Sequence, residues 1–270
     1  MDAATRLRYL EAMGIQAWRL RQAQAAGAPD PDVPEPRDEA RAPGGGMPDS
    51  GTGTMRPAAA APEPDAAMPA PAGPAPGDAG VQAMDWATLR EAVAGCTRCE
   101  LHRGRTQTVF GTGDPEADWM IVGEAPGRDE DLQGEPFVGR AGQLLNAMLR
   151  AVGLERDQVY IANILKCRPP DNRDPRPEEV LCCEPYLHRQ IALVGPRLIL
   201  AVGRVAAQNL LKTTRPIGRL RGRAHSYGPA GIPLIVTYHP AYLLRSPAEK
   251  RKAWQDLQLA VRTFQAAAGA

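Results

Sequence analysis

The sequence contains no run of 18 consecutive apolar residues, and residues 1–21 hold no continuous apolar stretch. A membrane-spanning helix needs about 20 apolar residues in a row, and a secretory leader needs an apolar segment of about 7–15 residues. We therefore expect neither a membrane span nor an export signal. The five cysteines of such a chain indicate a reducing, cytoplasmic location, where thiols serve metal binding or catalysis more often than disulfides.

Residues 22–84 lack Leu, Ile, Phe, Tyr and Trp altogether, while they contain 13 Pro, 17 Ala and 9 Gly. This composition cannot bury enough apolar surface to offset the entropy lost on ordering, so we predict a disordered linker. The folded part then spans residues 85–270, a normal size for one domain. Residues 1–21 carry apolar side chains at roughly helical spacing, which favours a short helix that docks on a protein partner, with a frayed terminus as the alternative.

Acidic residues are scarce near the end of the chain. Residues 197–270 hold 12 basic but only 2 acidic side chains, although the formal charge of the whole chain is +1. A basic region on a nearly neutral protein indicates a polyanionic partner, and nucleic acid is the first candidate. The alternative is a solvated surface whose acidic neighbours come from elsewhere in the fold.

Apolar segments alternate with helical patterns along the folded part. Strands are predicted at 118–127, 159–165, 197–203 and 232–240, and helices at 85–95, 141–153, 177–194, 204–211 and 246–265. This alternation predicts a three-layer α/β/α fold around a central, mostly parallel four-stranded sheet. Because ligands bind at the carboxyl ends of parallel strands, we expect a site in the turns that follow them.

The sequence also lacks the phosphate loop G-x-x-x-x-G-K-S/T and the dinucleotide pattern G-x-G-x-x-G. The segment after the first predicted strand reads GEAPGRDEDLQGEPFVGRAGQLLN, at residues 123–146, and a turn after the fourth reads HPAYLLR, at residues 239–245. A C-x-x-C pair stands at Cys96 and Cys99 without the second C-x-x-C of a zinc ribbon. Half a metal site and a redox dithiol both remain open for this pair.

Together, the segment at 123–146 and HPAYLLR resemble the uracil-DNA glycosylase superfamily, in detail its family 4, the iron-sulfur uracil-DNA glycosylases. The resemblance covers about residues 96–264. It implies a uracil-DNA glycosylase-like fold and a monomeric, monofunctional enzyme that hydrolyses the N-glycosidic bond of deoxyuridine in single- or double-stranded DNA. Such an enzyme releases uracil, leaves an abasic site for base-excision repair, and works in a bacterial-type cytosol or nucleoid.

The resemblance also implies a 4Fe-4S cluster held by four cysteines. The ligands match Cys96, Cys99, Cys167 in KCRPP, and one of the adjacent pair Cys182 and Cys183. Adjacent residues on a helix point about 100° apart, so only one of that pair can face the cluster. The family spacing selects Cys183. Four cysteines can bind zinc as well, but the resemblance favours an iron-sulfur cluster with a structural role.

Three residues match the uracil pocket of the family. Phe137 resembles the aromatic residue that stacks on the uracil ring. Asn163 resembles the amide that recognises the hydrogen-bonding edge of uracil, and His239 resembles the histidine that donates to uracil O2. Each has a plainer alternative. Phe137 can be ordinary core, Asn163 can satisfy a turn, and His239 can be a structural histidine before proline.

Two glutamates are candidates for positioning the attacking water. Ala125, which the resemblance places beside the bound uracil, stands where the best-known branch of the superfamily has a water-orienting Asp. Glu124, one residue away, is therefore the first candidate and Glu130 the second. Glu130 can instead crowd the space beside uracil C5 and reject thymine. Binding of the uracilate leaving group can supply much of the rate without a strong base.

The HPAYLLR turn is also predicted to contact DNA. Leu243 and Leu244 are expected to enter the base stack as an apolar wedge, with Tyr242 and Arg245 against the flanking bases or backbone. Burial of one of the two leucines is the alternative. The basic run at residues 215–223 is a further candidate for phosphate contacts.

Two functions of other classes remain open from the sequence. A uracil-DNA binding module would trap its ligand rather than turn it over. Covalently trapping relatives carry an Arg-rich insertion with a reactive His after the motif that starts at Gly123, and no such insertion interrupts VGRAGQLLN here. An iron-sulfur redox protein would need a cluster that cycles at an accessible potential.

Overall fold

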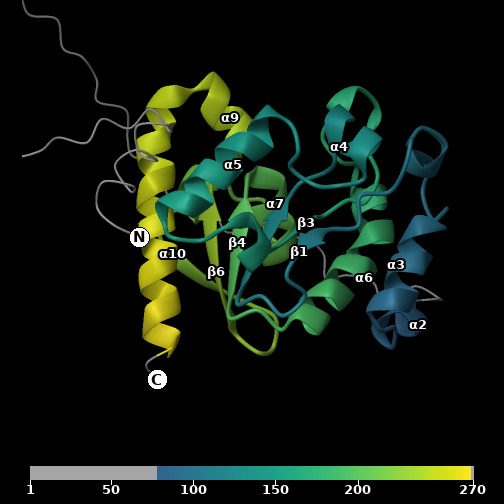
Figure 1. The fold of residues 1–270 in the computed structure, drawn as a ribbon, viewed down its shortest axis with the longest axis horizontal. Helices are drawn as coiled ribbons and strands as arrows, with labels where there is room; N and C mark the ends of the chain where they lie inside the picture. The colour runs from purple at the N-terminus through teal and green to yellow at the C-terminus, as the bar shows by residue number, and fades with distance from the viewer. Residues whose placement is uncertain (1–77, 269–270) are drawn as a thin grey trace, which may run out of the picture. The chain divides into compact units, whose positions relative to one another are not determined.

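A six-stranded sheet forms the centre of the computed structural model, which describes residues 78–268 (Figure 1). The strand order is β1-β3-β2-β4-β6-β5, and the four inner strands run parallel. The strands are β1 (Thr112–Gly113), β2 (Trp119–Gly123), β3 (Tyr160–Asn163), β4 (Leu198–Val202), β5 (Ala224–Tyr227) and β6 (Ile232–Thr237). The four predicted parallel strands are confirmed as β2, β3, β4 and β6.

The sheet is wider than the four strands predicted, because one antiparallel strand is added at each edge. β1 pairs with β3, and β5 pairs with β6. β1 has only two residues, and β5 reads AHSY with alternately exposed and half-buried positions. Neither has the continuous apolar pattern that identifies a strand buried on both faces.

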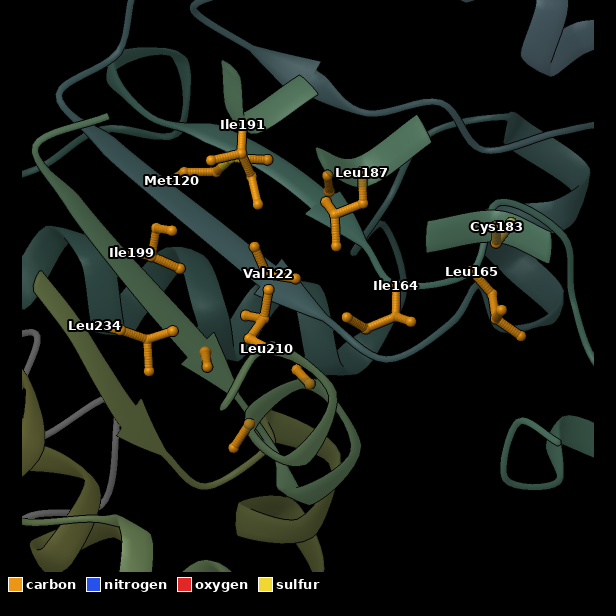
Figure 2. Close-up of a cluster of buried hydrophobic side chains, with 14 of the residues drawn as sticks. Met120, Val122, Ile164, Leu165, Cys183, Leu187, Ile191, Ile199, Leu210 and Leu234 are labelled. Carbon is orange, nitrogen blue, oxygen red and sulfur yellow. The ribbon is translucent and has the colours of Figure 1, made fainter. Parts of the chain in front are cut away.

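Helices cover both faces of the sheet, so the predicted three-layer α/β/α fold is confirmed. On one face, Met120, Val122, Ile199 and Leu234 of the strands pack against Leu187, Ile191 and Leu210 of the helices (Figure 2). On the other face the covering helices are α5 and α10. The helices are α2 (Asp78–Gln82), α3 (Trp86–Ala94), α4 (Arg128–Gln133), α5 (Arg140–Ala151), α6 (Pro177–Val194), α7 (Arg204–Leu211), α8 (Ile217–Leu220), α9 (Pro240–Arg245) and α10 (Lys250–Ala268).

The folded region begins earlier than the boundary predicted at Asp85. Val81 of α2 is buried in a small cluster with Leu89 and Tyr186, and the Arg189 guanidinium donates to the carbonyl of Met84 at 2.6 Å. The last residues of the predicted linker therefore pack on the domain. The predicted docking helix at 1–21 and linker residues 22–77 lie outside the described residues.

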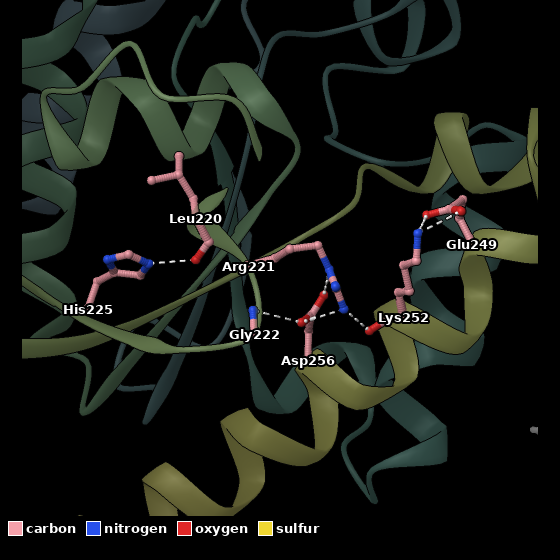
Figure 3. Close-up of polar contacts among 7 residues, drawn as sticks. All are labelled: Leu220, Arg221, Gly222, His225, Glu249, Lys252 and Asp256. Carbon is pink, nitrogen blue, oxygen red and sulfur yellow. Dashed lines mark hydrogen bonds and ion pairs between the residues drawn. The ribbon is translucent and has the colours of Figure 1, made fainter. Parts of the chain in front are cut away.

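The basic run at 215–223 is partly used inside the fold. Arg221 forms a bidentate ion pair with the fully buried Asp256 of α10, at 3.0 Å for both contacts, and the backbone N–H of Gly222 also donates to this carboxylate (Figure 3). Arg221 therefore joins the turn before β5 to α10, and phosphate contacts of the run stay a prediction. Among the described helices, none is long and apolar enough to cross a membrane.

Candidate functional site

A pocket of about 410 Å³ opens at the carboxyl ends of the parallel strands. β2 lies between β3 and β4. The strand that follows β2 in the chain, β3, is added on one side of β2, and the next strand, β4, is added on the other side. The order of the strands therefore reverses at β2. Ligands of α/β folds bind at this reversal. The pocket brings together eight of the residues predicted from the sequence: Glu124, Ala125, Glu130, Phe137, Asn163, His239, Tyr242 and Arg245.

Phe137 reaches the pocket through a strained backbone. Its φ is +55°, in the left-handed region that bulky residues rarely adopt. A methyl group on Gly123 would lie 2.6 Å from the Phe137 ring and would also meet the side-chain oxygen of Asn163, while one on Gly142 would collide with the Phe137 carbonyl. The two glycines therefore let the Phe137 ring and the Asn163 amide approach the end of β2.

Asn163, the last residue of β3, has a buried acceptor without a partner. The side chain is 2% exposed, and no donor in the described part of the chain bonds its Oδ1. An unsatisfied buried acceptor costs about 1–3 kcal/mol. A ligand that brings an N–H group into the pocket would remove this cost.

His239 presents a neutral imidazole. Its Nδ1 accepts the backbone N–H of Ala241 at 3.1 Å, so the ring proton lies on Nε2. Burial, with a smaller contribution from Arg245, lowers the pKa of His239 to about 4. Gly203, with φ of +102°, makes room for this histidine, because a methyl there would lie 3.0 Å from its Cβ. His239 therefore offers one N–H donor at neutral pH.

Glu124 follows β2 directly and lines the pocket. Burial raises its pKa to about 7; the nearby Asp174 adds to the rise and Arg204 opposes it. Asp174 and Arg204 form an ion pair with each other at 2.5 Å. A carboxyl group with a pKa near 7 is partly ionised at neutral pH and can accept a proton from water.

Glu130 is placed differently from the expectation. Its Oε1 accepts the backbone N–H groups of Val138 and Gly139 at 3.0 and 3.2 Å, and its Oε2 accepts that of Gly127 at 3.1 Å. Both carboxylate oxygens are thus engaged by main chain. Glu130 thereby holds the loop that carries Phe137, and its role in positioning water or crowding uracil C5 stays a prediction.

The predicted wedge on α9 is divided between core and surface. Leu243 is 1% exposed and packs in the core beside α5 and α10, so it does not reach DNA from this position, which corrects its prediction as an intercalating residue. Leu244 and Tyr242 are each 37% exposed. Tyr242 and Arg245 line the pocket, and Leu244 lies on the surface of the same helix.

The loop at 169–174 lines the pocket as well, and it was not predicted as part of the site. Asn172, Arg173 and Asp174 contribute to the lining. Arg173 is fixed by a bidentate ion pair with Glu179 at the start of α6. The available signal was the position of this proline-rich loop, PPDNRDP, after the second predicted strand.

All five cysteines line a second, small cavity. Cys96 and Cys99 come from the segment after α3, Cys167 from the loop after β3, and Cys182 and Cys183 from α6. None of them forms a disulfide. In the described residues no three His, Cys, Asp or Glu side chains are placed to hold a single metal ion. The four thiolates of a four-iron cluster each bind a different iron, so they surround the cluster and do not converge on a single point.

Hydrogen bonds distinguish the two adjacent cysteines of α6. Cys183 Sγ accepts the backbone N–H of Lys166 at 3.3 Å, as a metal-bound thiolate does, whereas Cys182 Sγ donates to the carbonyl of Arg98 at 3.2 Å. Cys167 Sγ accepts from the Arg105 guanidinium at 3.2 Å. The cavity therefore suits a ligand set of Cys96, Cys99, Cys167 and Cys183.

Comparison with known proteins finds a matching family. The model of the Uracil DNA glycosylase superfamily matches residues 110–258, more than half of the chain. The chain is 45% identical to the type-4 uracil-DNA glycosylase of Archaeoglobus fulgidus over 62% of its own length and 86% of the relative's. It is 43% identical to the type-4 enzyme of Pyrobaculum aerophilum, over 65% of this chain and 93% of the relative. It is 42% identical to the type-4 enzyme of Thermotoga maritima, over 63% of this chain and 90% of the relative.

Proposed function

This chain belongs to the uracil DNA glycosylase superfamily, in its type-4 branch, and from that premise we propose how its pocket cleaves uracil from DNA. It is a monofunctional DNA glycosylase, a hydrolase of DNA repair. Its substrate is DNA that contains deoxyuridine. The reaction breaks the bond between C1′ of the sugar and N1 of uracil, adds water to C1′, and leaves an abasic site.

The observation that carries the residue-level proposal is the unpartnered oxygen of Asn163. Uracil has an N–H donor at N3 beside the acceptor O4, so an amide can accept from the first and donate to the second. Cytosine presents the reverse pattern, with an acceptor at N3 and a donor at N4. The buried amide therefore favours uracil by satisfying its own oxygen, and a flipped-out base reaches it by leaving the stack. Phe137 stacks on the ring of the bound base.

The chemistry divides between His239 and Glu124. As the glycosidic bond breaks, its electron pair moves to the uracil ring and charge collects on O2, where His239 Nε2–H donates a hydrogen bond. Positive charge develops on the sugar, as in other glycoside hydrolysis. Glu124 holds the attacking water and takes its proton, and uracil leaves as the anion, which solvent protonates.

We further assign the ligands of a 4Fe-4S cluster to Cys96, Cys99, Cys167 and Cys183, with Cys182 as a neighbouring thiol. When bound, the cluster supplies a cross-link between three segments of the chain rather than electron transfer. This assignment is supported by the common cavity and by the N–H groups that point at Cys167 and Cys183.

Contacts outside the pocket follow from exposure and charge. We assign Leu244 to the gap left by the flipped base and Tyr242 and Arg245 to the flanking nucleotides. The enzyme acts as a monomer on single- or double-stranded DNA, in the cytoplasm where a bacterial-type chromosome lies. Residues 1–21 bind a protein partner, and the linker that follows sets their reach.

The proposed reaction is tested with an oligonucleotide that contains one uracil, followed by alkali to cleave at abasic sites. Matched oligonucleotides with cytosine or thymine at the same position are the controls. Cleavage of the uracil strand alone is expected. Uracil binding without release would favour the trapping module instead, and absence of both would contradict the pocket assignment.

A further inference from the structure

A buried lysine lies between the cysteine cavity and the uracil pocket. Lys166 is 1% exposed and stands three residues after Asn163 and one before Cys167. Its ammonium donates to the backbone carbonyl of Asn163 at 2.9 Å and to Oε1 of Gln190 at 2.6 Å. Both acceptors are neutral, so these bonds offset only part of the cost of removing an ammonium from water. Nothing in the proposed chemistry uses this group.

The main chain of Lys166 is fixed as firmly as its side chain. Its N–H donates to Cys183 Sγ at 3.3 Å, and its carbonyl accepts the N–H of Val109 at 2.8 Å. Figure 2 shows Cys183 beside the preceding residue, Leu165. One residue therefore touches a cysteine of the cavity with its backbone and the end of β3 with its side chain.

Gln190 connects the same lysine to the face of α6 that carries Cys183. The two residues are seven positions apart on one helix, which places them on the same side. Gln190 is fully buried, and its Nε2 donates to the carbonyl of Phe110 at 2.9 Å and to Tyr160 Oη at 3.1 Å. Because Gln190 is held at both ends of its amide, it gives Lys166 a rigid acceptor.

We propose that Lys166 is a positioning residue, which fixes the Asn163 amide in the pocket by tying the end of β3 to α6. The inference rests on the proposed function, since it takes Asn163 as the group that reads uracil. The unpartnered Oδ1 of Asn163 gains free energy by turning toward any available donor or water. The bond from Lys166 to the Asn163 carbonyl holds the main chain from which this side chain projects, and so limits the positions in the pocket that the amide can reach.

The test is Lys166→Met, which keeps the length of the side chain but removes its donors. Lys212→Met is the matched control, because Lys212 is half-exposed and its ion pair with Glu184 lies outside the pocket. Iron content, KM and kcat on a uracil oligonucleotide, and the inhibition constant of free uracil are measured for each. We expect Lys166→Met to keep its iron, to weaken uracil binding about tenfold, and to raise KM more than it lowers kcat.

A merely structural lysine gives a different result. Destabilisation lowers the active fraction and hence kcat, but the folded molecules bind uracil as before. Wild-type affinity for free uracil in Lys166→Met overturns the proposal, whether or not iron is lost. If that variant does not fold, Gln190→Leu takes its place with a smaller expected loss of uracil affinity, and unchanged affinity there overturns the proposal. Should the wild type and Lys212→Met release no uracil, the proposed function fails and this inference with it.

Discussion

The proposed role of Glu124 as base predicts how uracil release depends on pH. Its pKa of about 7 lies in the accessible range, and the carboxylate, not the acid, accepts a proton from water. At pH 6 roughly one tenth of the molecules carry the carboxylate and at pH 8 roughly nine tenths, so the single-turnover rate should rise about tenfold between them. His239 does not obscure this rise, because its pKa of about 4 keeps it neutral throughout.

Neighbouring charges should move the midpoint in opposite directions. Asp174 raises the pKa of Glu124 and Arg204 lowers it. Asp174→Asn should therefore shift the midpoint of the rate profile to lower pH, and Arg204→Gln should shift it to higher pH. Glu124→Gln should lower the rate and remove the pH dependence, since an amide cannot accept the proton.

The assay is single-turnover release of uracil from a labelled oligonucleotide between pH 5.5 and 8.5, with enzyme in excess. Glu116→Gln, a change of the same kind at an exposed position before β2, is the control and should follow the wild-type profile. A wild-type rate that does not change between pH 6 and 8 would refute the role of Glu124 as base. The same conclusion follows if Glu124→Gln keeps the wild-type slope.

Three further substitutions test other parts of the site. His239→Ala should lower the single-turnover rate of uracil release by about 10²–10³-fold, because one donor to the developing charge is lost. DNA binding in a mobility-shift assay should be kept, and a smaller effect on the rate than on binding would contradict this role. Gly123→Ala should yield a folded protein by circular dichroism that binds uracil poorly, because its methyl group meets the Phe137 ring, and normal uracil binding would argue against the crowding. Cys183→Ala should lose iron in a metal assay and Cys182→Ala should keep it, and the opposite result would reverse the ligand assignment.

The strands that hold the site were predictable because of how they are buried. β2 and β4 are covered on both faces, so their sequences are continuously apolar. This pattern distinguishes them from the polar turns on either side. β5 has no continuous apolar pattern. It is an edge strand with one exposed face, and its sequence is AHSY. The apolar pattern detects only buried strands, so it could not predict the two edge strands or the full width of the sheet.

The site residues divide in a similar way. Asn163 and His239 stand at the ends of apolar strands, where the parallel topology brings them together. The role of Glu130 depends on three backbone N–H groups that converge only after the loop has folded. Leu243 and Leu244 are adjacent in sequence, and which of them is buried depends on how α9 packs against α5. Residue type alone does not carry that information.

Three polar groups of the pocket are each in a state that folding alone does not favour. Asn163 keeps an acceptor without a donor, His239 is a half-buried imidazole with its pKa lowered to about 4, and Glu124 is a carboxyl group with its pKa raised to about 7. Burial away from water causes all three. In the proposed mechanism a uracil base supplies a donor for the first and an acceptor for the second, and a water molecule supplies a proton donor for the third. Under this proposal the free-energy cost of these states is recovered when substrate binds, so the folded protein can keep the site ready for its reaction.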